Sequence, residues 1–150
     1  MKIIIQRVSK ASVTVDQKII SEIKKGVLIL LGIANDDALD DIQWVCNKII
    51  NLRIFPDENE VMNLSLKEVI GEVIVVSQFT LMASTKKGNR PSYIKAAKLE
   101  ISKPLYEQFV AELEHILNKK IGTGIFGADM KVALINDGPV TIIIDSKNRV

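Results

Sequence analysis

A short row of hydroxyl and amide side chains follows a strongly apolar segment. The sequence VSQFTL, residues 76–81, places Ser77, Gln78 and Thr80 directly after the apolar run at residues 73–76. Such groups can orient a substrate and stabilise an oxyanion, but without a base they activate water poorly. They would suffice for a labile bond, such as an ester with a helpful neighbouring hydroxyl. The alternative interpretation is an ordinary strand end with satisfied side chains, although strand ends and the loops after them often carry function.

No credible general base accompanies these hydroxyls. The only histidine, His115, falls off the apolar stripe of a predicted helix and is expected to face water, out of reach of a target proton. The only cysteine, Cys46, lies on the apolar stripe of another predicted helix and is expected to be a core thiol. A single cysteine also excludes an intramolecular disulfide and a four-cysteine zinc site. The sequence contains no Walker loop, metal-spaced His/Cys set or helical HExxH motif, and GTGIFG at 122–127 lacks the spacing of a dinucleotide fingerprint.

A second unusual element is the dipeptide Gly138-Pro139 in INDGPVTIII, residues 135–144. The β-branched residues 140–144 suit a strand, whereas glycine adds freedom and proline removes a backbone donor. Residues 131–145 are therefore expected to form two strands with a Gly-Pro interruption. The residues alone favour an ordinary turn with a trans peptide bond.

The chain around these groups predicts a sheet. Runs of β-branched residues at 2–8, 11–16, 18–23 and 27–34 predict four strands, joined mostly by short turns, which favours antiparallel pairing. The segment 52–71 is mixed in composition and is expected to be a loop.

Two helices are expected outside this sheet. Asn35 is predicted to cap the first, with acidic residues in its first turn. Its apolar stripe comprises Ala38, Ile42, Val45, Cys46, Ile49 and Ile50. The second is predicted from about Lys103 to Asn118, with the stripe Leu105, Phe109, Leu113, Ile116 and Leu117. We therefore expect one domain over residues 1–150 with an α+β fold: a curved, largely antiparallel or mixed sheet or barrel with two main outer helices.

Charge and hydropathy argue against a protein that binds long nucleic acid and against a secreted or membrane-spanning one. The net charge is only +2, so the chain as a whole has no strong footprint for long nucleic acid. Locally, KKGNR at 86–90 and the lysines after it form a basic stretch, which is either a solvated loop or a contact with a few phosphates. No segment resembles a signal peptide or reaches the ~20 apolar residues of a membrane span. A soluble, cytoplasmic protein without a membrane partner is expected.

Several motifs, taken together, resemble one family along nearly the whole chain. They are QRVSKASVTVD, NLRIFPDENEVMNLS, VSQFTLMASTKKGNRPSY and TGIFGADMKVALINDGPVTIIIDS. In this order and spacing the chain is similar to the D-aminoacyl-tRNA deacylases. The resemblance implies a homodimeric, cytoplasmic editing enzyme that hydrolyses the ester between a D-amino acid and the 3′-terminal adenosine of tRNA. It implies no metal, no organic cofactor and no DNA partner.

The resemblance also implies roles for particular residues. The SQxxT element, here Ser77, Gln78, Phe79 and Thr80, would form one wall of the catalytic pocket.

The opposite wall would come from the partner subunit. There Gly138-Pro139, with a cis peptide bond, would filter the substrate's handedness. Arg7 would hold the orientation of this dipeptide, and Phe126 and Met130 would line the adenosine side.

Two mechanisms and one other class of function remain open at this stage. We favour substrate-assisted hydrolysis, in which the vicinal 2′-hydroxyl of the tRNA positions or activates water. The alternative is Thr80 as a covalent nucleophile, which lacks a partner to deprotonate it. A non-catalytic module that binds tRNA ends is the other class, but its stacking aromatics should follow a basic groove, and the aromatic residues here are few and scattered. Editing of glycine mischarged onto tRNA for alanine is not distinguished from D-residue removal.

Overall fold

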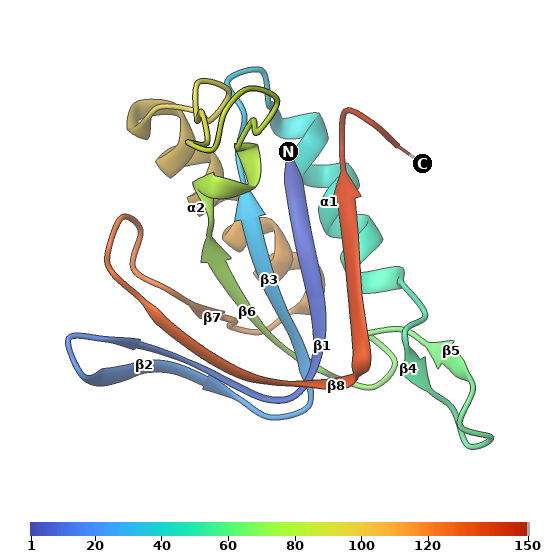
Figure 1. Cartoon of the computed structure of the whole chain (residues 1–150). Coiled ribbons are helices and arrows are strands. Elements are labelled where there is room, and N and C mark those ends of the chain that lie inside the picture. Colours follow the sequence, from blue (N-terminus) through green and yellow to red (C-terminus); the bar gives the residue numbers. More distant parts are fainter. Residues whose placement is uncertain (150) are drawn as a thin grey trace.

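Six strands form one strongly curved, mixed sheet in the computed structural model, which describes residues 1–149 (Figure 1). The neighbours in order are β2 (Lys18–Ile23), β1 (Lys2–Val15), β3 (Gly26–Gly32), β6 (Glu72–Ser77) and β7 (Gly122–Thr123), and β8 (Lys131–Asp145) also pairs with β1. β1 is antiparallel to β2, β3 and β8, whereas β3, β6 and β7 are parallel to one another. The predicted curved sheet is thus confirmed, in its mixed form.

β1 is one continuous strand where the sequence predicted two. It passes through the exposed Ser9 and Lys10 without a break, so the first 34 residues form three strands rather than four. On one edge it changes partner, from β3 along residues 2–8 to β2 along residues 11–15, while β8 stays paired on the other edge. Ser9 and Lys10 lie where the register of β1 with β8 shifts. Such an irregularity bends a strand and interrupts its apolar alternation without ending the strand pairing.

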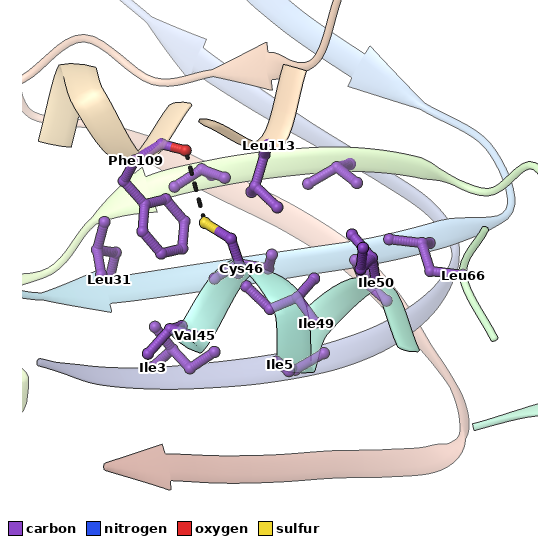
Figure 2. Packing of buried hydrophobic residues seen from close by; sticks show 14 of the residues in the cluster. Ile3, Ile5, Leu31, Val45, Cys46, Ile49, Ile50, Leu66, Phe109 and Leu113 are labelled. Atoms are coloured by element: carbon purple, nitrogen blue, oxygen red, sulfur yellow. Dashed lines mark hydrogen bonds between the residues drawn. The ribbon is translucent and has the colours of Figure 1, made fainter. Parts of the chain in front are cut away.

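The main hydrophobic core lies between two helices and one face of the sheet. α1 (Leu39–Asn51) and α2 (Leu99–Leu117) pack together behind β1, β3 and β6 in Figure 1. Ile5, Cys46 and Phe109, from β1, α1 and α2, meet in this core (Figure 2). The Cys46 thiol is fully buried, 3.9 Å from the carbonyl of Phe109, and burial, with a smaller contribution from the charge of Glu112, raises its pKa. The prediction of a core thiol is confirmed, since a nucleophilic cysteine needs its thiolate form.

Both helices form, but each starts at a different residue from the one predicted. α1 begins at Leu39 with Ala38 as its N-cap, because the Asp41 carboxylate accepts the Ala38 N–H at 2.9 Å; Asn35 lies outside the helix. α2 begins at Leu99, four residues before the predicted start, with Pro104 in its second turn. Its first turn was not predicted because Leu99 and Ile101 are exposed and the buried residue of the turn, Ser102, is polar, so the turn has no apolar periodicity.

The remaining elements are short. β4 (Phe55–Pro56) and β5 (Met62–Leu64) pair as a small hairpin within the segment that was predicted to be a loop. The 3₁₀ helix η1 (Phe79–Met82) follows β6 directly. Within residues 1–149, no helix is long and apolar enough to cross a membrane.

Candidate active site

A pocket of about 440 Å³ opens where β6 ends and η1 begins. The end of β3, the start of α2 and the connector before β8 complete its walls. Its lining is Leu31, Ile33, Val76, Ser77, Gln78, Phe79, Ala97, Leu99, Ser102, Phe126, Gly127, Ala128, Met130 and Val132. The structure therefore brings five of the predicted site residues together at one pocket, from segments about 50 residues apart. None of the lining side chains is a carboxylate, histidine, lysine, arginine or thiol.

Close packing at the end of β3 fixes the SQxxT element. The Gln78 N–H donates to the Leu31 carbonyl at 2.7 Å, which carries the β6 backbone one residue past the strand. Gly32 lets η1 lie against β3, because a Cβ at this position would come within 2.8 Å of the Leu81 Cβ. This hydrogen bond and this close packing fix the turn between β6 and η1, so the polar groups of residues 77–80 are held at the pocket mouth.

Thr80 does not line the pocket but is bonded to a residue that does. The Gln78 Nε2 donates to the Thr80 hydroxyl oxygen at 2.5 Å. An amide cannot take a proton from this hydroxyl, so the contact orients Thr80 without activating it as a nucleophile.

The backbone N–H groups of Phe79 and Thr80 lack an acceptor within residues 1–149. The Leu81 N–H donates to the Gln78 carbonyl, and the Ala83 N–H donates to the Thr80 carbonyl. Within the part of the chain that the structure describes, the N–H groups of Phe79 and Thr80 have no backbone acceptor. Paired backbone donors of this kind can stabilise an oxyanion when they face the reacting carbonyl.

Tyr106 supports the opposite wall of the pocket and was not predicted. Its ring packs against the ring of Phe126, with centroids 5.5 Å apart, and its hydroxyl donates to the Val75 carbonyl at 2.8 Å. Burial raises the pKa of this hydroxyl to about 12, although a hydrogen bond with the backbone at Gly124 opposes the shift. Tyr106 thus ties β6, the connector and α2 together behind the residues that face the pocket.

We expect Tyr106→Phe to destabilise the fold by about 1–2 kcal/mol. The variant keeps the ring but removes the hydroxyl, so the buried Val75 carbonyl keeps only its longer hydrogen bond from the Gly124 N–H. Chemical denaturation monitored by circular dichroism measures this loss. Phe126, whose ring packs against that of Tyr106, should then be held less firmly in the pocket wall. An unchanged unfolding midpoint would mean that the Gly124 N–H, 3.3 Å from the same carbonyl, satisfies it alone.

Gly138 and Pro139 lie at a bend in β8 that departs from the ladder. Gln6 of β1 pairs with Thr141 and Val8 pairs with Asn136, so a step of two residues on β1 faces a step of five on β8. The Gly138–Pro139 peptide bond is cis, as the resemblance implied, and φ of Gly138 is +144°. β8 is therefore one strand with a bulge at the corner visible in Figure 1, rather than two strands separated by a turn.

Arg7 and Asn136 hold this bulge from both sides. The Arg7 guanidinium donates from Nε to the Asp137 carbonyl at 2.8 Å and from Nη1 to the Ile54 carbonyl at 2.6 Å. The side chain of Asn136, which sequence reasoning missed, accepts the Val140 N–H at 2.8 Å and donates to the Thr141 hydroxyl at 2.7 Å. The bulge is a defined structure whose exposed tip is the Gly-Pro dipeptide.

The bulge and the pocket are separate within one chain. Arg7, Gly138 and Pro139 are absent from the pocket lining, and the contacts of Arg7 place the bulge beside the segment that leads into β4. His115 is exposed near the end of α2, as predicted, and is also outside the pocket. Within residues 1–149, no three His, Cys, Asp or Glu side chains are grouped closely enough to hold a metal ion.

Comparison with known families decides between the candidate interpretations. A family model described as D-Tyr-tRNA(Tyr) deacylase matches residues 4–145. The chain belongs to this deacylase family. A D-aminoacyl-tRNA deacylase of Flavobacterium psychrophilum is 70% identical over 149 residues, which cover 99% of both chains. A D-aminoacyl-tRNA deacylase of Bacteroides thetaiotaomicron is 64% identical over the same share of both chains.

Solved structures agree with this assignment. The family fold is seen in a c-Myc DNA unwinding element binding protein, which is 39% identical and superposes with a TM-score of 0.92 over 97% of this chain and 98% of that one. A probable eukaryotic D-amino acid tRNA deacylase superposes with a TM-score of 0.83 over 95% and 97% of the two chains, but at 15% identity that likeness concerns the fold alone. The resemblance drawn from the sequence and the predicted α+β class are confirmed.

Proposed function

We propose that this protein cleaves the ester between a D-amino acid and the 3′-terminal adenosine of tRNA and spares the corresponding L-aminoacyl ester. Editing of this kind is the activity of the family, and the relatives named D-aminoacyl-tRNA deacylase are 64% and 70% identical over nearly the whole chain. Aminoacyl-tRNAs are made and used in the cytoplasm, so we propose that the protein acts there.

The observation that supports the mechanism most strongly is the chemistry of the pocket lining. The pocket lining offers hydroxyl and amide groups but no side chain that ionises near neutral pH, and the backbone N–H groups of Phe79, in the lining, and of Thr80, next to it, have no backbone acceptor within residues 1–149. A site of this kind can position an ester and stabilise an oxyanion. We infer that the substrate's own 2′-hydroxyl positions or activates the attacking water, with the N–H groups of Phe79 and Thr80 directed at the oxyanion. The alternative, Thr80 as nucleophile, finds only an amide beside its hydroxyl.

We further propose that two copies of the chain complete each site. The outer edge of β8 has no strand partner within the described residues, and Ile135 and Ile143 on this strand are 49% and 71% exposed. The tip of the Gly138-Pro139 bulge is exposed and lies outside its own chain's pocket. In a two-fold dimer the same contact occurs twice, so each bulge would reach the pocket of the partner subunit. Phe126 and Met130 would then face the adenosine.

A filter made of backbone would select by rejection. It would block the direction taken by an L side chain and leave a D side chain in open space, whatever its size. Glycine has no side chain to reject, so the same site should also accept glycyl-tRNA.

We expect the purified protein to hydrolyse D-Tyr-tRNA and glycyl-tRNA at least about 100-fold faster than L-Tyr-tRNA. Loss of radiolabelled amino acid from acid-precipitable tRNA measures each rate. A non-catalytic module that binds tRNA ends would leave all three esters intact. Hydrolysis of D-Tyr-tRNA with glycyl-tRNA as resistant as L-Tyr-tRNA would instead mean that the site recognises the D side chain positively.

A further inference from the structure

The segment from residue 83 to residue 98, here called the basic loop, leaves the pocket at one wall and returns at the other. It begins where η1 ends and leads into Leu99, which lines the pocket together with Ala97. Two contacts fix its path. Ser84 and Ser92 exchange backbone hydrogen bonds of 2.8 and 2.9 Å, and the Ala97 N–H donates to the Ile33 carbonyl at 2.9 Å. Both ends of the loop therefore lie beside the pocket, whereas Ala83, Ser84, Ile94 and Lys95 line a second cavity next to the N-terminus.

The positive charge of the chain is concentrated in this loop. It contains five basic residues and no acidic one, whereas the other residues comprise fifteen basic and eighteen acidic side chains. The five are Lys86, Lys87, Arg90, Lys95 and Lys98. None of them takes part in an ion pair within residues 1–149. A solvated surface of mixed charge does not require this segregation, and an unpaired cluster of cations at a pocket rim attracts a polyanion.

Two aromatic rings meet between the pocket and the basic loop. Phe79, which lines the pocket, and Tyr93, in the loop, are packed edge to face with centroids 5.0 Å apart and planes at 69°. Both rings are accessible, since Phe79 is 57% and Tyr93 39% exposed. Phe79 and Tyr93 are distant in the sequence, but in the fold they form one aromatic surface beside the basic side chains of the loop. Proteins that bind single-stranded nucleic acid combine these two features: rings on which bases stack and a basic surface that contacts phosphates.

We propose that the basic loop binds the unpaired nucleotides that precede the terminal adenosine of the tRNA. The base next to the terminal adenosine stacks on the Phe79–Tyr93 surface, and the basic side chains contact the phosphates on either side of it. This inference rests on the proposed function, because a terminal adenosine inside the pocket requires the rest of the strand to leave across the rim. The loop thus distinguishes an aminoacyl ester on tRNA from one on a free nucleoside.

The aromatic surface is tested with two substrates, D-Tyr-tRNA and D-tyrosyl-adenosine. We expect Tyr93→Ala to raise the ratio of KM for the tRNA to KM for the adenosine about tenfold, since the variant removes a ring on which a base stacks. Tyr93→Phe keeps the ring and should keep the wild-type ratio. Ile94→Ala is the matched control, because Ile94 is the neighbouring loop residue, is 86% exposed and has no ring.

The charges are tested by the salt dependence of KM for D-Tyr-tRNA. Replacing Lys86, Lys87 and Arg90 together with glutamine should reduce the slope of log KM against log salt by up to about 2, because each phosphate contact to a single strand contributes about 0.7. A triple replacement of Lys10, Lys18 and Lys24, which are exposed on β1, β2 and the turn after β2, serves as the control and should leave the slope unchanged.

Two results would overturn the inference. The first is an unchanged KM ratio in Tyr93→Ala, including an equal rise of both KM values, which would mean that Tyr93 only supports the pocket. The second is an unchanged salt slope in the loop triple variant, which would mean that the basic side chains do not contact the RNA. Failure of the proposed function is distinct, since the wild-type protein would then hydrolyse neither substrate.

Discussion

A D-aminoacyl-tRNA that ends in 2′-deoxyadenosine is expected to be hydrolysed at least about 100-fold more slowly than the natural substrate. Positioned acid–base groups contribute about 10²–10⁴ to a rate, and the pocket lining provides no ionisable side chain that could replace the missing hydroxyl. Single-turnover hydrolysis with enzyme in excess measures the chemical step apart from binding. In the same assay no inflection of the rate with pH should come from an enzyme side chain, because the pocket lining has none that titrates near neutral pH; the α-amino group of the substrate is the group expected to titrate there.

Thr80→Ala is the matched test of the other mechanism. This variant removes the hydroxyl that accepts a hydrogen bond from the Gln78 side-chain amide, but it keeps the backbone N–H at residue 80. Under substrate assistance we expect it to retain activity within about tenfold of the wild type. An inactive Thr80→Ala protein, together with normal hydrolysis of the deoxy substrate, would establish Thr80 as the nucleophile.

The second large effect is expected from Arg7. Arg7→Ala removes the hydrogen bonds to the Asp137 and Ile54 carbonyls, so the bulge that carries Gly138-Pro139 loses its support. A displacement of about 1 Å in a positioning group can cost about 100-fold in rate, and we expect a loss of kcat/KM of that size. Gly138→Ala should cause a similar loss, since φ is +144° and a Cβ would lie 2.9 Å from the Val140 nitrogen.

Two controls separate this effect from general damage. Arg7→Lys keeps the charge but not the planar fork, so it should recover little activity. Light scattering should give a dimer mass for the wild type and for Arg7→Ala, because the substitution alters one bulge and not the whole of β8. Full activity of Arg7→Ala, or an active wild-type monomer, would contradict a site completed by the partner's dipeptide.

The sequence predicted the parts of the fold that depend on local patterns. The helical stripe around Cys46 was found because apolar residues at helical spacing identify a buried face. The pocket wall at Ser77 and Gln78 was found because polar residues abruptly follow a buried run. The continuity of β1 through Ser9 and Lys10 was missed, since the local pattern does not show that β8 pairs across the polar residues.

The parts of the site that were missed depend on contacts between distant residues. The Tyr106 hydroxyl binds a carbonyl 31 positions earlier in the chain, and helical periodicity alone assigns a tyrosine on this face to the core. Asn136 was missed because no local pattern shows that its side chain bonds to Val140 and Thr141 within a bulge of β8. The role of Arg7 came from the family resemblance, and no local signal connects it to a carbonyl 130 positions away.

The pairing of β1 with β8 also bears on how the chain acquires its structure. Residues 2–14 of β1 lie against residues 131–145 of β8, so one whole edge of β1 stays open until residues 131–145 have left the ribosome. Contacts so distant in sequence close slowly, because the entropy of a long loop is lost before the pairing compensates for it. We therefore expect the curved sheet to be completed only after residues 131–145 have emerged, with β1 exposed to chaperones in the interval.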